Sequence, residues 1–315
     1  PTGHIVAAGE LMPYGSIKQT VLRGSNAFAS SDAWSAPVAA RVGPDGALWI
    51  ADWYNPIIQH NVVFRYYNAA RGYDQPHSPY QSGEKKGPGK GNAYDTPLRD
   101  DKHGRIWRIV PDKGSVRKET GIDPSKPASL VAALSSPSQL IRLQAQRVLV
   151  ENGAKESIPS LEKLIASGAS PAGSDLPLTA VNAIWTLEGI GAPAGSDAHR
   201  ILVSALKSSH PLVRRHAVMA LTSKDSAVVA ELPGFIEKTE DPRELLYVLT
   251  AAALAPPDSK ISAALTNRLG GGYALDATLQ EAGQLALRRQ GMTLLSADFS
   301  TFPAAAKTWY ENEIL

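Results

Sequence analysis

The sequence contains no cysteine among its 315 residues. This absence excludes disulfide bonds, cysteine nucleophiles and thiolate metal sites, although it leaves the cellular compartment open. A charge excess is also missing, because 32 basic residues face 30 acidic ones and no Lys/Arg stripe stands out. We therefore expect no nucleic-acid partner. The longest apolar run, residues 245–257, is roughly a dozen residues and ends in two prolines, too short to span a bilayer.

The length favours two domains, and a hydrophobic fraction of 43% is enough for ordinary cores. The chain begins at Pro1 without an initiator methionine or a signal-like apolar segment. The sequence predicts either a removed leader or, preferably, a piece of a longer protein.

The most informative stretch is 43–55, Gly-Pro-Asp-Gly-Ala-Leu-Trp-Ile-Ala-Asp-Trp-Tyr-Asn. Pro44, Asp45 and Gly46 are typical turn residues, and the Leu-Trp-Ile run that follows suits a half-buried strand. A second strand is expected over 104–110, where Ile106, Arg108 and Val110 alternate with Arg105, Trp107 and Ile109. This strand pair is typical of a β-propeller blade.

Further short strands are predicted at 4–8, 17–22 and 37–42, with turns at 13–15, 23–26 and 30–32. Residues 1–114 therefore predict an all-β domain of two to three blades, at roughly 40–50 residues per blade. A propeller needs about four blades to close, so we expect the others to lie upstream. Residues 68–102, rich in Gly, Pro and Lys, are interpreted as a surface loop or, alternatively, as a lid over a site.

After a linker at 115–124, residues 125–315 repeat a helical pattern. The segment Arg142–Leu149 aligns without gaps on Arg214–Leu221, and weaker copies pass through Ala180, Leu245 and Leu279. Second amphipathic helices follow, and the period of roughly 31–38 residues is typical of two-helix solenoid repeats. The fold class expected is thus mixed and multidomain, a partial β-propeller followed by an all-α HEAT-like superhelical solenoid of about five repeats.

The role of such a solenoid is to hold a partner or to brace a neighbouring domain. We expect Arg142 and Arg214 to satisfy carbonyl groups between repeats rather than to bind a substrate. We expect Trp185, His216 and Met219 to be core or groove residues.

Candidate functional residues gather near the ends of the two signature strands. Asp52 and Asn55 could supply oxygen ligands to calcium. The catalytic candidates are His60 and His103, as a general base, and Arg105. The alternative is that Asp52 and Asn55 cap the following turn while the histidines form hydrogen bonds between blades.

Residues 43–60, followed by His-Gly-Arg-Ile-Trp-Arg-Ile at 103–109, resemble a family of membrane-bound dehydrogenase-type proteins of the PVC bacterial group. The resemblance implies a propeller similar to quinoprotein glucose/sorbosone dehydrogenases, followed by HEAT repeats. It implies pyrroloquinoline quinone and calcium as cofactors, with Trp53 and Tyr54 as candidate contacts, and an extracytoplasmic location, periplasmic or secreted. Relatives commonly end in a haem c domain, and the lack of cysteine means that no such haem is attached to this chain.

Two functions follow. The chain is either the C-terminal part of an exported dehydrogenase that oxidises a sugar or another small alcohol, or a non-catalytic scaffold that binds protein or glycan. In both cases we expect the HEAT surface to hold a protein partner.

Overall fold

The computed structural model describes residues 4–32, 34–54, 102–110, 112, 122–270 and 276–291. The chain divides into two compact units. The N-terminal unit comprises Pro1–Glu10 and Thr20–Glu119, and the C-terminal unit comprises Leu11–Gln19 and Thr120–Leu315.

Strands β1 (Ile5–Tyr14) and β2 (Ile17–Ala29) form a long two-stranded hairpin. Gly15 adopts φ +56° in its two-residue turn, a conformation that glycine accepts without steric cost. The turn predicted at 23–26 is wrong, because β2 runs through it. A two-residue turn at Gly15–Ser16 places 23–26 opposite the first residues of β1, so strand pairing overrides the local turn preference of Gly-Ser-Asn.

The other strands form an antiparallel sheet in the order β3 (Pro37–Val42), β4 (Leu48–Asp52), β5 (Arg105–Ile109). Their pairing sets Val42 opposite Leu48 and Asp52 opposite Arg105. The predicted alternation in β5 is confirmed, since Ile106 is 74% exposed while its neighbour Arg105 is half-buried. The expectation of short antiparallel strands in the first part of the chain is therefore correct.

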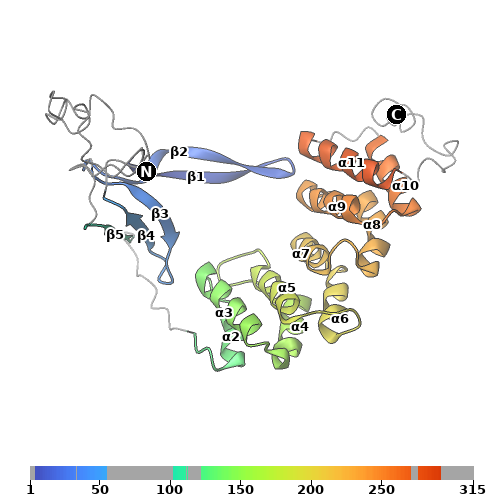
Figure 1. The fold of residues 1–315 in the computed structure, drawn as a ribbon, viewed down its shortest axis with the longest axis horizontal. Helices are drawn as coiled ribbons and strands as arrows, with labels where there is room; N and C mark the ends of the chain where they lie inside the picture. The colour runs from blue at the N-terminus through green and yellow to red at the C-terminus, as the bar shows by residue number, and fades with distance from the viewer. Residues whose placement is uncertain are drawn as a thin grey trace, which may run out of the picture. The chain divides into compact units, whose positions relative to one another are not determined.

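The described part of the C-terminal unit contains ten α-helices and a short 3₁₀ helix, η2. Their bounds are α2 (Pro127–Ala133), α3 (Gln139–Glu151), η2 (Lys155–Ser157), α4 (Ile158–Ala166), α5 (Leu178–Ile190), α6 (Asp197–Ala205), α7 (Pro211–Leu221), α8 (Ser226–Lys238), α9 (Pro242–Leu254), α10 (Ser259–Gly270) and α11 (Ala277–Gln290). In the ribbon of Figure 1, α3, α5, α7, α9 and α11 follow one another in a row, each packing on the next. On the second side α4 packs on α6, and α8 packs on α10.

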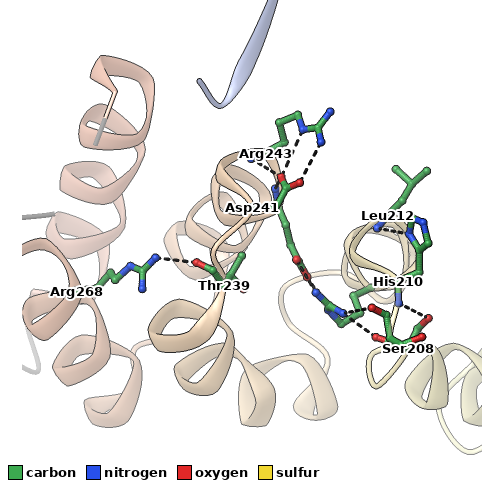
Figure 2. A network of polar contacts seen from close by, with 10 residues as sticks. Ser208, His210, Leu212, Thr239, Asp241, Arg243 and Arg268 are labelled. Atoms are coloured by element: carbon green, nitrogen blue, oxygen red, sulfur yellow. Dashed lines mark hydrogen bonds and ion pairs between the residues drawn. The ribbon is translucent and has the colours of Figure 1, made fainter. Parts of the chain in front are cut away.

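Local signals begin several helices as the sequence predicts. Pro211 and Pro242 occupy first-turn positions of α7 and α9, where the missing N–H costs no helical hydrogen bond. Asp241 caps α9 by accepting hydrogen bonds from the backbone N–H groups of Arg243 (2.8 Å) and Glu244 (3.0 Å) (Figure 2).

A single hydrophobic cluster runs from α2 to α11. The alanines at equivalent positions of α3 and α7, Ala145 and Ala217, are both fully buried, as expected for close helix packing. In α11 Leu279 is buried, whereas the side chain of Leu285 is 53% exposed. The buried positions include Gly283, where an added Cβ would lie 2.7 Å from the side chain of Leu269, so close approach of α10 sets the register of α11. No helix in the described ranges is both long and apolar enough to cross a membrane.

Arginines at matching positions of α3 and α7 bind loop carbonyls. Arg142 Nη1 donates to the carbonyl oxygens of Ser136 (2.7 Å) and Pro137 (3.2 Å). Arg214 Nη1 donates to those of Ser208 (2.8 Å; labelled in Figure 2) and Ser209 (3.1 Å). The prediction that these arginines satisfy carbonyl groups is confirmed for the loops that precede α3 and α7.

Arg214 also forms a fork with the next helix of its row. Its Nε and Nη2 lie 2.7 Å from the two carboxylate oxygens of Glu244, which is only 3% exposed. A two-bond arginine–carboxylate pair of this kind is directional as well as strong. It connects α7 to α9 at a point where neither charge can be hydrated well.

Replacing Arg214 by Met should destabilise the chain by about 3 kcal/mol, because it leaves the Glu244 charge buried without a partner. Urea unfolding followed by far-UV circular dichroism measures this loss. The matched control is Arg200→Met, because its pair with Glu162 is exposed and should contribute at most about 1 kcal/mol. The double variant with Glu244→Leu should recover much of the loss, and equal losses for Arg214 and Arg200 would contradict the account.

Candidate functional site

The turn before β4 is built as its residues predict. Gly46 adopts φ +81°, and its N–H donates to the carbonyl of Gly43 at 3.0 Å. The carboxylate of Asp45 accepts hydrogen bonds from the N–H of Ala47 (3.1 Å) and from Arg108 Nε (2.8 Å) on β5. The turn therefore connects β4 to β5 through a side chain as well as through the backbone ladder.

Asp52 ends β4 and its side chain is fully buried. Its oxygens accept hydrogen bonds from Ala36 N (2.7 Å), Trp107 Nε1 (2.9 Å), Tyr54 N (3.0 Å), Arg105 Nε (3.0 Å) and Ser35 Oγ (3.1 Å). In addition, Arg105 Nη2 lies 2.8 Å from Asp52 Oδ2. The bond to the N–H two residues on is the turn-capping role that we considered as the alternative for Asp52.

These donors explain the acidity of Asp52. Burial on its own would raise the pKa of the carboxyl group, but the hydrogen bonds, led by the one from Trp107, outweigh it and lower the pKa to about 2. The carboxylate is thus ionised at any physiological pH. Its charge is balanced inside the protein by Arg105.

Arg105 carries two acidic partners and two aromatic ones. Besides Asp52, its Nη1 lies 2.8 Å from Asp32 Oδ2. The hydrogen bonds raise its pKa further although burial opposes them. Its Cζ lies 4.3 Å from the ring centroid of Tyr54 and 5.2 Å from that of Trp107, within the range of cation–π attraction.

Tyr54 is held in an uncommon backbone conformation, with φ +57°. For a bulky side chain this conformation is strained and is kept only where the surroundings enforce it. Here Asp52 accepts its N–H, Arg105 covers one part of its ring, and Trp34 stacks on it with centroids 5.7 Å apart and 29° between planes. His103 meets the same ring edge-on at 6.3 Å.

These groups line a pocket of about 410 Å³. Its lining consists of Trp34, Tyr54, His103, Gly104 and Arg105. Two aromatic rings and few polar groups are typical of a small-molecule site, and the volume lies in the usual range for one. The structure thus joins three of the predicted candidates, Tyr54, His103 and Arg105, with Trp34, which lies in the segment before β3.

The remaining candidates do not line this pocket in the described part of the chain. Trp53 is 42% exposed and its N–H donates to the carbonyl of Ala36 at 3.0 Å. Asn55 and His60 lie outside the described residues, as does nearly all of the predicted loop or lid at 68–102.

Sequence reasoning missed Trp34 and Asp32. Residues 30–32 were interpreted only as a turn, yet Asp32 Oδ1 accepts the N–H of Trp34 at 2.9 Å and fixes the start of the aromatic stack. The signal that could have found them is the Asp-x-Trp order directly after a turn cluster. Such an Asp fixes the backbone two residues on.

Calcium does not fit at Asp52. This cation takes six to eight oxygen ligands, whereas both oxygens of Asp52 already accept protein donors and face the positive charge of Arg105. Within the described ranges no three His, Asp or Glu side chains gather to hold a metal. The pocket is also a poor match for the three carboxylates of pyrroloquinoline quinone, because its one arginine is already balanced by two aspartates.

A larger pocket, of about 570 Å³, lies among α7, α8 and α9 in the C-terminal unit. Three of its charged lining residues are already paired: Arg214 with Glu244, and Asp241 with Arg243 at 3.0 Å (Figure 2). This pocket is large because it is a groove between helices, and several of its polar groups are already paired within the protein. The smaller pocket at Tyr54 is the better candidate for ligand binding.

Residues 1–113 match the model of a family described as a domain of unknown function, DUF7133. The match covers β1 to β5 and every residue of the Tyr54 pocket. No curated protein matches the chain.

Asp52→Asn should destabilise the N-terminal unit by about 2–3 kcal/mol at pH 7, because an amide cannot accept all of these donors or balance Arg105. The stabilisation by ionised Asp52 is fully present above about pH 4 and is lost as the pH falls through about 2, since folding lowers its pKa. Urea unfolding followed by tryptophan fluorescence should show a smaller loss of stability between pH 4 and pH 2 in the variant than in the parent.

The matched control is Glu10→Gln, which removes an exposed pair with Arg23 and should change stability by less than about 1 kcal/mol. An Asp52→Asn protein as stable as the parent at pH 7 would show that the carboxylate does not hold the site together.

Proposed function

We propose that the chain is a recognition scaffold that binds a neutral, sugar-like ligand at the Tyr54 pocket and holds a protein partner on its helical rows. The observation that carries the proposal is the stacked pair of Trp34 and Tyr54 beside an arginine whose charge is already balanced. The aromatic lining suits the apolar face of a pyranose ring, with Trp34 as the proposed platform because Trp34 and Arg105 already pack against the Tyr54 ring. His103 and the backbone at Gly104 supply polar edges. A strongly anionic ligand would find no unbalanced positive charge there.

The fold that we propose for this scaffold is finer than the arrangement described above. We assign the sheet β3-β4-β5 to a blade of a β-propeller, because a tight turn and short antiparallel strands in chain order are typical of one. We assign the rows of helices to a HEAT-like solenoid, because the helices pair at a regular spacing and each packs on its neighbours. The extracytoplasmic location remains a proposal that rests on the family resemblance of residues 43–60 and 103–109.

A panel of neutral oligosaccharides, screened on a glycan array and followed by titration calorimetry, tests the ligand class. Trp34→Ala and Tyr54→Ala should each weaken the binding of the best ligand about tenfold or more, which corresponds to about 1.4 kcal/mol. The control is Trp49→Phe, because Trp49 lies on β4 against Arg108 and does not line the pocket. Binding that survives both pocket variants, or no binding to any member of the panel, would contradict the proposal.

The second candidate function is that of a quinoprotein-like dehydrogenase part, favoured by the paired motifs at 43–60 and 103–109. It predicts dye-linked oxidation of a sugar or a small alcohol by the product of the full-length gene supplied with pyrroloquinoline quinone and calcium. Turnover in that assay that is lost in His103→Ala would support the dehydrogenase over the scaffold. No quinone binding and no turnover over a broad substrate panel would reject it.

A further inference from the structure

Helix α7 carries a second, outward-facing stripe. Its inward face buries Val213 and Ala217 in the core. The outward stripe repeats at i, i+3, i+4 and i+7, which places its members on one side of the helix. These members are Leu212, Arg215, His216 and Met219. Met219, which we expected to be a core or groove residue, is 40% exposed and lies at the outer edge of this stripe.

An aromatic residue flanks this stripe on each neighbouring helix. Trp185 of α5 donates from Nε1 to His216 Nδ1 at 3.1 Å, and the two rings meet edge-on at 6.0 Å. On the other side the guanidinium of Arg215 lies over Tyr247 of α9, 4.9 Å from the ring centroid. Three successive helices of the row thus form one continuous surface, which we call the α7 face. It comprises Trp185, Leu212, Arg215, His216, Met219 and Tyr247.

The α7 face carries one positive charge without a counter-ion. Over the described ranges Arg215 has no hydrogen-bond or ion-pair partner, and its Nε is buried. The neighbouring arginines differ, since Arg214 is held by Glu244 and Arg243 by Asp241. The buried Nε has no acceptor, whereas the two Nη groups are not among the buried atoms and can meet an acceptor from outside.

His216 adds a neutral donor. Burial, helped by the charge of Arg215, lowers the pKa of His216 to about 4, so the ring is uncharged at neutral pH. Because Nδ1 accepts from Trp185, the proton of the neutral ring is on Nε2. The α7 face therefore combines a guanidinium and a neutral imidazole with the exposed Met219 and with partly buried apolar and aromatic groups.

We propose that the α7 face docks an acidic peptide segment of a partner protein, with a carboxylate accepting from Arg215 and an adjacent apolar side chain on Met219. This inference rests on the partner-holding role proposed for the helical rows and gives it a location and a chemistry. Charge complementarity selects this occupant, because a basic segment would face the unbalanced arginine and a neutral one would leave its charge without a counter-ion. Arginine and aromatic residues are also the groups that most often dominate binding energy at interfaces.

The test uses the full chain and a short fluorescent peptide in which Glu alternates with Leu, compared with the same peptide carrying Gln. The Glu peptide should bind at least about tenfold more tightly, and the preference should shrink as salt is raised. Arg215→Met should abolish the preference. Arg215→Lys should keep only part of it, because a lysine cannot form the two-bond fork.

The matched control is Arg147→Met on α3 of the same row, which removes an equal charge from an exposed pair with Glu151 and should leave binding unchanged. Arg215→Met should keep or raise the melting temperature, because the guanidinium has no internal acceptor. A clear loss of stability would instead make Arg215 a structural residue and overturn the inference. Binding should also shift the indole N–H resonance of Trp185, and a shift elsewhere only would place the peptide on another surface.

Equal binding of the Glu and Gln peptides, or binding of anionic vesicles in place of the peptide, overturns the acidic-peptide assignment. Self-association of the chain through this face, measured by sedimentation and lost in Arg215→Met, would overturn it in favour of a second copy. None of these outcomes touches the sugar-binding test, because Trp34 and Tyr54 belong to the other unit.

Discussion

The buried carboxylate of Asp52 is the constraint on which the candidate site depends. A charge with no exposure must be satisfied internally, and here the donors come from three separate pieces of chain, the segment at 35–36, the residue after β4, and β5. Satisfying Asp52 fixes Arg105, and Arg105 fixes the ring of Tyr54 beneath Trp34. The pocket is therefore a consequence of the way in which one anion is neutralised.

The same physical rule operates in the helical unit with the opposite sign of charge. Arg142 and Arg214 are cations whose guanidinium groups are taken up by loop carbonyls and, for Arg214, by a buried glutamate. These bonds fix the conformation of the loops between helices, because each loop carbonyl accepts a hydrogen bond from an arginine that is held by its helix. Arg215, one residue further on, has no such internal acceptor in the described part of the chain. For this reason we propose a binding role for it rather than a structural one.

A structural feature could be predicted from the sequence when the residues that cause it lie close together in the chain. Asp241 with Pro242 predicts the start of α9, and Gly46 predicts its turn, because the physical cause lies within a few residues. The arginine–carbonyl contacts were predictable as well, since the Arg repeats with the helices. The turn expected at 23–26 fails because pairing with β1 across the hairpin overrides the local preference.

The site shows the same division. Asp52 could be singled out as a polar residue at a strand end, but sequence spacing cannot show that its oxygens are occupied by donors as far away as Trp107. That occupation changes its interpretation, from an open ligand for a cation to a closed structural centre. Trp34 escaped notice because its importance lies in stacking on Tyr54, which is a tertiary contact.

The most direct test of this account is a carbon-13 NMR titration of the Asp52 side-chain carboxyl, assigned by comparison with Asp52→Asn, in the presence and absence of calcium. The account predicts a carboxyl pKa of about 2 and no change in the resonance when calcium is added. A carboxyl that titrates near its ordinary value of 3.8, or one whose resonance moves with calcium, would contradict the conclusion that Asp52 is satisfied within the protein.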